Sequence, residues 1–328
     1  MNKELELWQF IADRLKKDQR VMLLVVATSS GSSPGRPGYK MAVAEDGELI
    51  GSIGGGVMEV NLVEQSRAIL SEPPAVAGGL PQAVRDQVHR KDVSDSSGMI
   101  CSGKQTVIFK LLTFGDLERV KYAIDGIVNR EGDVLLITNE VFAVGHPECP
   151  TETDLDFTRE SQRDFTYYER LGAKNDLFII GGGHCALALS ELMSKMDFHV
   201  RLFDDRPRLN TIEKNKFANE INVIDSYDDI GRHIDSSDRA YVVVMTLGYK
   251  TDAVVIRQVI DKNLKYFGVL GSKAKMATLF RELIDEGFSQ ERLDRIHSPI
   301  GLPVNSHSPE EIAVSIAAEI ISVKNSTK

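Results

Sequence analysis

Cysteine is scarce in this sequence, and its scarcity excludes several classes of protein. Among 328 residues there are three cysteines, Cys101, Cys149 and Cys185. Their number is odd and no two of them form a CxxC pair. The chain is therefore neither a disulfide framework nor a cysteine-rich zinc protein.

Long apolar runs are also missing. No stretch approaches the roughly 20 apolar residues that a membrane-spanning helix needs. The opening residues, MNKELELWQFIADRLKK, carry acidic side chains and lack the apolar centre of a secretory signal peptide. We therefore expect a cytoplasmic protein without a membrane span.

An excess of positive charge is absent too. The chain has 39 Lys and Arg residues against 48 Asp and Glu residues, a formal net charge of −9 and a pI of about 5.4. Because no dense basic stripe offsets this acidity, nucleic acid is not an expected partner. The 42% of hydrophobic residues suffices for a packed core. The length suits about two domains of roughly 150 residues each.

The first half of the chain mixes strand and helix patterns without regular alternation. Apolar residues at helical spacing, with charges between them, predict an opening helix over residues 4–16. Strands and helices are then expected in the order: strand 21–30, two short strands around Asp46 and Gly47, a helix after 54–56, strand 106–112, helix 116–130, and strands 133–138 and 140–144. This order indicates an α+β domain over residues 1–145.

A polar segment separates the two halves. Residues 146–172 are acidic, contain two prolines and show no apolar period, which predicts a linker. From residue 173 to 328, apolar runs alternate with helical stretches. This order predicts a Rossmann-like, doubly wound parallel sheet with a C-terminal helix. The whole chain is thus expected to be α/β, with the α+β domain first.

A glycine turn opens the second half. Gly181, Gly183 and Ala186 fit the G-x-G-x-x-G/A pattern after a predicted strand, and Asp204 follows at the end of the next strand. In a Rossmann domain this turn brings the backbone close to a pyrophosphate, and the acidic residue accepts a hydrogen bond from a ribose hydroxyl. The turn predicts bound NAD(P), although a Rossmann-like domain can also bind another ligand or none.

Three further side chains lie close to this turn in the sequence. His184 opens the helix and could contact an anion or carry a proton, or could only line the turn. Arg206 could bind a phosphate or pair with the neighbouring carboxylates. Cys185 is interpreted as a small packing residue.

A second glycine motif lies in the first half. Gly54, Gly55 and Gly56 directly precede a predicted helix, and successive glycines allow backbone N–H groups to form a nest for an anion. Glu59, one turn inside the helix, would accept hydrogen bonds from a polar heterocycle and disfavour bare phosphate. The alternative is a tight turn with a surface glutamate. The preceding loop, residues 31–38 with Arg36 and nearby Lys40, could add cations to a phosphate site or be solvated.

Cys101 is the candidate metal ligand. It lies in MICSGKQTVIF, just before a predicted strand, with Lys104 three residues later. A nearby cation lowers the pKa of a thiol and favours the thiolate, which suits sulfur or metal ligation. The alternative is a buried structural thiol.

At these motifs the chain resembles the xanthine dehydrogenase accessory factor family, XdhC/CoxI. The first half is similar to the family in GSSPGRPGYKMAVAEDGELIGSIGGGVMEV, and the second half in LFIIGGGHCALAL and VRLFDDRP. YFGVLGSKAKM and IHSPIGLPVNSHSPEEIAVSIAAEII resemble the family's ending. The chain departs from the family pattern at Ser102, at Leu247, where a histidine is usual, and at residues 305–308.

The resemblance implies a cofactor chaperone and not an oxidising enzyme. Such a protein binds the molybdenum cofactor (molybdopterin), protects it while its sulfido ligand is installed, and inserts it into a molybdenum hydroxylase such as xanthine dehydrogenase. The resemblance also implies a cysteine desulfurase as a second partner and a homodimer. It assigns cofactor contacts to Cys101 and to Gly54, Gly55, Gly56 and Glu59.

Two other functions remain open at this point. An NAD(P)-dependent oxidoreductase or nucleotide-binding protein would use Gly181, Gly183 and Asp204, but no catalytic acid/base set accompanies them, and no catalytic residue is assigned. An interaction module would keep the Rossmann half only to dock a partner.

Overall fold

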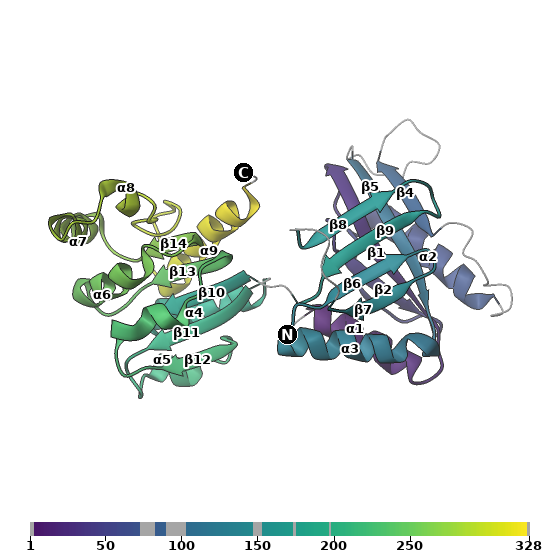
Figure 1. Cartoon of the computed structure of the whole chain (residues 1–328), viewed down its shortest axis with the longest axis horizontal. Coiled ribbons are helices and arrows are strands. Elements are labelled where there is room, and N and C mark those ends of the chain that lie inside the picture. Colours follow the sequence, from purple (N-terminus) through teal and green to yellow (C-terminus); the bar gives the residue numbers. More distant parts are fainter. Residues whose placement is uncertain are drawn as a thin grey trace. The chain divides into compact units, whose positions relative to one another are not determined.

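The chain folds into two compact units, Met1–Ala173 and Lys174–Lys328 (Figure 1). The computed structural model describes residues 3–72, 83–89, 103–146, 153–172, 175–196 and 198–326. Each unit contains helices and strands with its own buried core. None of the helices in these described ranges is long and apolar enough to cross a membrane.

The first unit is built on two antiparallel sheets. One sheet has the strand order β3-β2-β1-β5-β4 and the other β7-β6-β9-β8. In chain order its elements are α1 (Lys3–Leu15), β1 (Val21–Gly31), β2 (Lys40–Ala44), β3 (Leu49–Gly51), α2 (Gly56–Ser71), β4 (Val84–His89), β5 (Gly103–Leu112), the 3-10 helix η1 (Phe114–Asp116), α3 (Leu117–Asn129), β6 (Val134–Thr138), β7 (Phe142–Gly145), β8 (Leu155–Arg159) and β9 (Phe165–Arg170).

Strand β1 explains how this unit is held together. Its residues 21–27 are buried on both faces, and successive side chains of a strand point to opposite faces. Leu23 packs in one core with Trp8 of α1, whereas Leu24 packs in another core with Met58 of α2. The apolar run at 21–26 therefore places helices on both faces of the first sheet.

The predicted linker over 146–172 is wrong for the part that β8 and β9 occupy. Strand β9 pairs with both β6 and β8, and its Phe165 and Tyr167 are buried in the core of the first unit. The residues that alternate with them along β9 are less buried. A half-buried strand of this kind has few apolar residues, so its composition resembles that of a linker. The first unit accordingly extends to Ala173, beyond the predicted boundary at 145.

The second unit is a five-stranded parallel sheet with the order β12-β11-β10-β13-β14, which confirms the predicted doubly wound fold. In chain order its elements are β10 (Asn175–Ile180), α4 (His184–Ser194), β11 (Phe198–Asp204), α5 (Asn210–Lys214), β12 (Glu220–Val223), the 3-10 helix η2 (Tyr227–His233), β13 (Ser237–Val244), α6 (Tyr249–Val259), β14 (Leu264–Val269), α7 (Lys273–Asp285), α8 (Gln290–Leu293) and α9 (Pro309–Asn325).

Helices cover both faces of this sheet. Residues of α6 and α7 share one core with the strands, and residues of α4 and α9 share the other. Helix α9 begins at a capping box, in which the Ser308 hydroxyl accepts from the Glu311 N–H and the Glu311 carboxylate accepts from the Ser308 N–H. The strand order reverses between β10 and β13, and in such sheets ligands bind at the carboxyl ends of the strands beside that reversal.

Candidate functional site

The glycine turn lies at this reversal in strand order. Gly181 follows β10 directly and has a φ of +105°, which favours glycine. A Cβ at Gly181 would lie 2.4 Å from the carbonyl oxygen of Met245, so the turn also needs glycine for close packing against the end of β13. The Gly181 N–H donates to the Phe203 carbonyl at the end of β11. The turn therefore joins the carboxyl ends of three strands.

Gly183 has a different role from Gly181. Its φ is −70°, and a Cβ built on it would meet no atom within 4 Å. Neither the backbone nor packing within the chain demands glycine at this position. The missing side chain instead leaves the N-terminal end of α4 open to approach, as a phosphate-binding turn requires. His184 is exposed beside it on the first turn of α4.

Asp204 does not present its carboxylate to a ligand. The residue is 0% exposed, and Oδ2 accepts hydrogen bonds from the Gly182 N–H at 2.6 Å and from Arg206 Nη2 at 2.7 Å. Oδ1 accepts from the Arg206 N–H and Nε, each at 2.8 Å. The protein's own donors occupy both oxygens in this structure, and the predicted hydrogen bond from a ribose hydroxyl stays a prediction. Of the two outcomes considered for Arg206, the pairing with a carboxylate is confirmed.

The electrostatics of this pair agree with its geometry. Burial alone would raise the pKa of Asp204, but the hydrogen bonds from Arg206 and Gly182 outweigh it and lower the pKa. The Asp204 carboxylate in turn raises the pKa of Arg206. The pair therefore stays ionised and fixes the glycine turn to the end of β11. The Arg206 side chain remains 34% exposed beside the turn.

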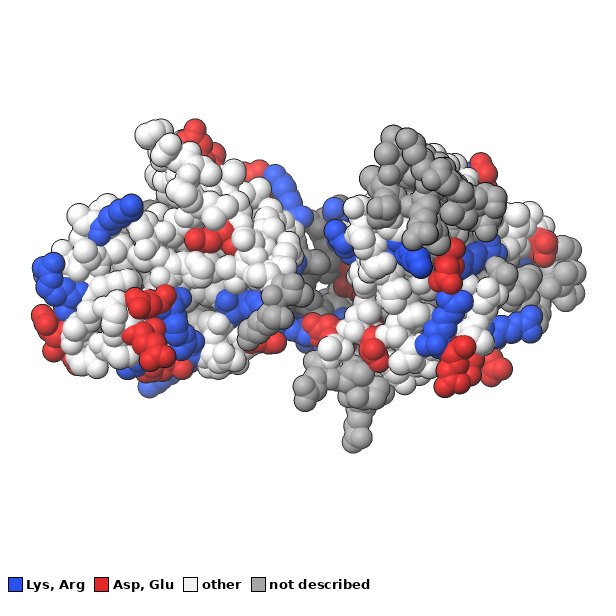
Figure 2. All heavy atoms as spheres, turned by 90° about the horizontal axis from the view of Figure 1, so that it is seen from above, with Lys and Arg blue, Asp and Glu red and all other residues white. Residues whose placement is uncertain are grey.

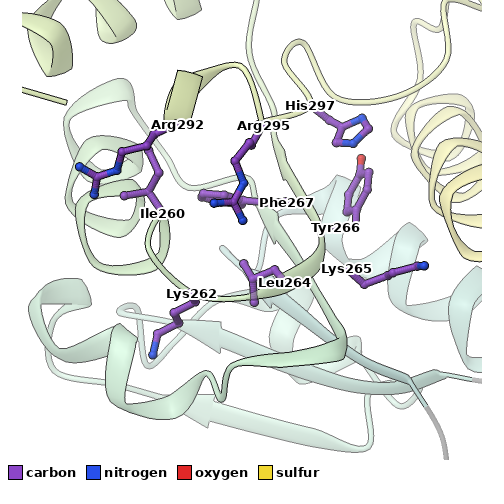
Figure 3. Close-up of a pocket in the computed structure, with 9 residues that line it drawn as sticks. All are labelled: Ile260, Lys262, Leu264, Lys265, Tyr266, Phe267, Arg292, Arg295 and His297. Carbon is purple, nitrogen blue, oxygen red and sulfur yellow. The ribbon is translucent and has the colours of Figure 1, made fainter. Parts of the chain in front are cut away.

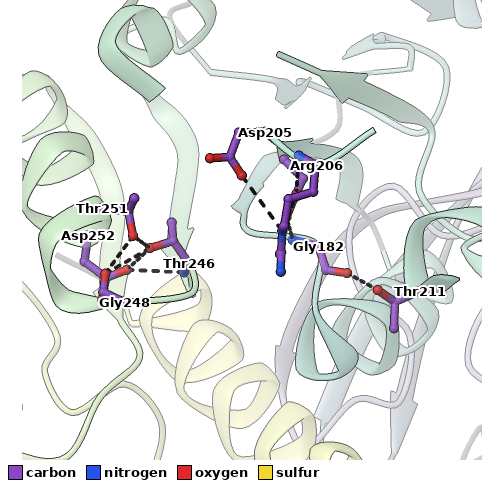
Figure 4. Close-up of polar contacts among 9 residues, drawn as sticks. Gly182, Asp205, Arg206, Thr211, Thr246, Gly248, Thr251 and Asp252 are labelled. Carbon is purple, nitrogen blue, oxygen red and sulfur yellow. Dashed lines mark hydrogen bonds and ion pairs between the residues drawn. The ribbon is translucent and has the colours of Figure 1, made fainter. Parts of the chain in front are cut away.

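A polar network that the sequence analysis missed lies across the reversal in strand order (Figure 4). Asp252 is fully buried, and its Oδ1 accepts from the Thr246 hydroxyl at 2.6 Å and the Thr246 N–H at 3.2 Å. Lys275 Nζ donates to its Oδ2 at 2.7 Å. The Thr251 hydroxyl donates to the Gly248 carbonyl at 2.8 Å, which closes the loop before α6. The sequence feature that could have indicated this network is the group of polar residues directly after β13, Thr246, Thr251 and Asp252.

Two further side chains near the carboxyl ends of these strands are Cys185 and Leu247. Cys185 packs against the core shared by α4 and α9, as predicted. Burial, and then the charge of Glu310, raise the pKa of its thiol, so it is not a ready thiolate. Leu247, where the family usually has histidine, is 83% exposed at the tip of the loop after β13.

In the first unit the glycine motif is a turn with positive φ angles. Gly54, Gly55 and Gly56 have φ values of +127°, +76° and +74°, which L side chains rarely adopt. A Cβ at Gly54 would lie 2.6 Å from the N atom of Gly35, so the turn packs directly against the 31–38 loop. The structure thus explains the glycines by backbone conformation and close approach.

The Glu59 carboxylate accepts hydrogen bonds from the loop that leads into this turn. Its Oε2 accepts from the Ile53 N–H at 2.8 Å, the Gly55 N–H at 2.9 Å and the Ser52 hydroxyl at 2.7 Å. The Ile53 and Gly55 N–H groups thus already hold an anion that is a side chain of the same chain, and an anion-binding role for Gly54, Gly55 and Gly56 stays a prediction. The predicted role of Glu59 as an acceptor for a heterocycle is not what its Oε2 does here.

A buried amide, which no motif in the sequence indicates, ties the two glycine loops together. Gln105 on β5 is 1% exposed, accepts from the Ser33 hydroxyl at 2.8 Å and donates from Nε2 to the Ile53 carbonyl at 2.7 Å. Gly35 packs against the Ile53 carbonyl and the Gln105 amide, because its Cβ would lie 2.3 Å from the Ile53 carbonyl oxygen and 2.5 Å from Gln105 Oε1. Cys101, two positions before Gly103 in the sequence, lies outside the described residues.

The cations of the 31–38 region do not converge on a site. Lys40 is almost fully buried and donates to Glu169 at 2.5 Å and to the Gly38 carbonyl at 3.2 Å. Arg36 is exposed. On the face of the molecule seen in Figure 2, acidic and basic side chains are interspersed among the described residues.

A small pocket lies beside the edge strand β14 (Figure 3). It is lined by Ile260, Lys262, Leu264, Lys265, Tyr266, Phe267, Arg292, Arg295 and His297. Arg292 pairs with Asp261, and in Figure 3 the charged ends of Arg292 and Lys265 point away from each other. Although the lining is basic, its charges do not converge, and we assign no ligand to it.

The strand order, the glycine turn and the two covered faces define the second unit as a Rossmann-type domain that follows an α+β domain. Two family models match the chain. The XdhC and CoxI family model matches residues 14–76, and the XdhC Rossmann domain model matches residues 177–320. Together they cover more than half of the chain. The chain belongs to the XdhC/CoxI family, which confirms the resemblance seen in the sequence.

Relatives of known sequence agree with this assignment. The chain is 24% identical over 330 residues to a probable xanthine dehydrogenase component of Bacillus subtilis (strain 168), covering 95% of this chain and 96% of that protein. It is 23% identical over 301 residues to the uncharacterised protein YqeB of Escherichia coli (strain K12), covering 92% of this chain but 43% of YqeB. The chain thus spans less than half of YqeB.

A solved structure shares the whole architecture. The crystal structure of a xanthine dehydrogenase from Bacillus halodurans superposes with a TM-score of 0.71 at 26% identity, covering 99% of this chain and 96% of that one. The similarity therefore extends over both units and is not confined to the common Rossmann half.

Proposed function

We propose that this protein is an accessory factor that binds the molybdenum cofactor and delivers it to a xanthine dehydrogenase-like molybdenum hydroxylase in the cytoplasm. The observation that carries the proposal is the presence of both family modules, in order, in one chain. The relatives named as xanthine dehydrogenase components support the choice of client. A cysteine desulfurase is the proposed source of the sulfido ligand, and the proposed working form is a homodimer.

The first unit is the proposed holder of the metal end of the cofactor. Its two glycine loops are locked by Gln105 and Glu59, which preorganises the backbone beside the start of β5. Cys101 precedes β5 in the sequence and is the proposed thiolate ligand, since thiolates suit soft metal centres. In the second unit taken by itself, the open end of α4 at Gly183 is a proposed contact for the phosphate of a nucleotide.

Cofactor retention and transfer test the proposal directly. The full-length protein is mixed with isolated molybdenum cofactor, freed of unbound ligand, and added to the apo hydroxylase. We expect Cys101→Ser to lower cofactor affinity by well over tenfold, about 1.4 kcal/mol or more, and to activate the client poorly. Cys149→Ser is the matched control and should behave like the parent. Equal retention by the parent and by Cys101→Ser would remove Cys101 from the site.

Nucleotide binding is the second candidate function, and the position of Arg206 indicates which nucleotide would bind. Arg206 occupies Asp204, the acidic residue that would otherwise receive a ribose hydroxyl, and its side chain is partly exposed beside the turn. An arginine at this place suits a 2′-phosphate. If this candidate holds, calorimetric titration should give tighter binding of NADPH than of NADH. Binding of neither at millimolar concentration would leave the turn a structural element.

A further inference from the structure

Three potential metal ligands converge in the first unit, away from both glycine motifs in the sequence. Glu131, Asp133 and His146 each offer one ligand atom, and these atoms all lie within 4.8 Å of one another. Asp133 directly precedes β6 and His146 directly follows β7, and these strands form an antiparallel hairpin in which Val134 lies opposite Gly145. The pairing register therefore places Asp133 and His146 side by side at the open end of the hairpin.

Asp133 distinguishes this cluster from ordinary surface acids. It is 0% exposed, yet neither of its carboxylate oxygens accepts a well-oriented hydrogen bond from the described residues. His146 Nδ1 lies 2.8 Å from Oδ1 but does not meet the direction that a hydrogen bond requires. A buried carboxylate left without donors is costly, so such a group calls for a partner.

The surrounding chain makes room for this carboxylate and holds it in place. A Cβ at Gly126 of α3 would lie 1.8 Å from Asp133 Oδ2, so the glycine creates the space that the carboxylate occupies. Glycine inside a helix costs roughly 1 kcal/mol relative to alanine, and this packing gives it a reason. The Asp133 carbonyl accepts from the Leu171 N–H at 2.7 Å, which fixes the backbone beside the end of β9.

We propose that Glu131, Asp133 and His146 bind a divalent first-row transition-metal ion, such as Mn²⁺ or Zn²⁺. One imidazole and two carboxylates form a mixed nitrogen and oxygen set that suits these ions better than Mg²⁺ or Ca²⁺, which take oxygen ligands. Tetrahedral ligands about 2.1 Å from an ion lie about 3.4 Å apart. Glu131 and His146 are both exposed side chains, so they can adjust to that separation around the fixed Asp133. Three protein ligands leave a coordination position for water or a ligand.

Manganese binding tests the proposal without interference from the cysteines, since Mn²⁺ prefers oxygen and nitrogen ligands to thiolate. The metal-free, full-length protein is titrated with Mn²⁺ and free ion is followed by electron paramagnetic resonance. We expect one Mn²⁺ per chain, displacement by Zn²⁺, and at least tenfold weaker binding of Mg²⁺. His146→Ala should lower Mn²⁺ affinity at least tenfold, and because this side chain is 57% exposed the variant should fold.

Two further variants complete the test. Asp133→Asn keeps the shape of the side chain and should also lower affinity at least tenfold. His199→Ala is the matched control, because His199 makes the same 2.8 Å contact to a carboxylate, Glu220, whose second oxygen is occupied by Arg201. Parent-like affinity in His146→Ala, or no Mn²⁺ bound by the parent at millimolar ion, would overturn the proposal. Its failure would leave cofactor delivery untouched, since that assay depends on Cys101.

Discussion

Replacing Glu59 should destabilise the first unit before it affects any ligand. Its single oxygen Oε2 receives two backbone N–H groups and a hydroxyl from the 52–55 loop. Hydrogen bonds to charged groups contribute about 1.5–3 kcal/mol when buried. Because this loop is partly solvated, we expect Glu59→Ala to lower the free energy of unfolding by about 2 kcal/mol in total. Glu59→Gln keeps an acceptor but loses the charge, and should cost about 1 kcal/mol.

Thermal unfolding of the full-length protein measures this effect. For a unit of this size, about 1 kcal/mol shifts Tm by roughly 2–4 °C. Glu59→Ala should therefore lower the Tm of the first unit by about 4–8 °C. Glu64→Ala is the control, because Glu64 lies exposed on the same helix. Equal Tm values for Glu59→Ala and Glu64→Ala would refute the reasoning. If cofactor affinity alone fell, Glu59 would be a ligand contact and not the anion of the loop.

Two predictions concern the second unit. Gly181→Ala should lower its unfolding free energy by about 2–4 kcal/mol in urea denaturation, because the new Cβ meets the Met245 carbonyl at 2.4 Å and the φ is positive, whereas Gly183→Ala should leave it unchanged. Since the folded pKa of Asp204 lies below its unfolded value near 3.9, its pair with Arg206 should stabilise the fold above about pH 4 and lose that effect as pH falls through the folded pKa. Acid titration by circular dichroism should then show a smaller loss in Asp204→Asn, and an identical acid profile would contradict the assignment.

The sequence predicts the parallel sheet well because its central strands are apolar on both faces. A strand that is buried on both faces consists of consecutive apolar residues, as in the buried run Leu177–Ile180. Such a run can be recognised from composition. Strands β8 and β9 escape the same reasoning, because only alternate residues such as Phe165 and Tyr167 face the core. Their pairing with β6 depends on long-range contacts, which local composition does not reveal.

In the candidate sites, too, some features are predictable from the sequence and others are not. The glycines at 54–56 and at 181 are predictable because unusual backbone angles demand that residue type. The partners of polar side chains are not predictable in this way. The Arg206 contact to Asp204 was one of two open outcomes, and the contact of Gln105 with Ile53 spans distant positions in the sequence. Gly126 shows its purpose only when Asp133 is seen against it.

The hydrogen-bonded carboxylate of Glu59 has a consequence for selectivity. A tethered anion is present at a high effective concentration, so a free anion that approaches the Ile53 and Gly55 N–H groups must compete with it. We expect inorganic phosphate, which lacks a tether, to lose this competition. A larger ligand with contacts elsewhere can displace the side chain, which then exchanges its donors for water. We therefore expect the loop to reject small, abundant anions and to keep its hydrogen bonds to Glu59 in their presence.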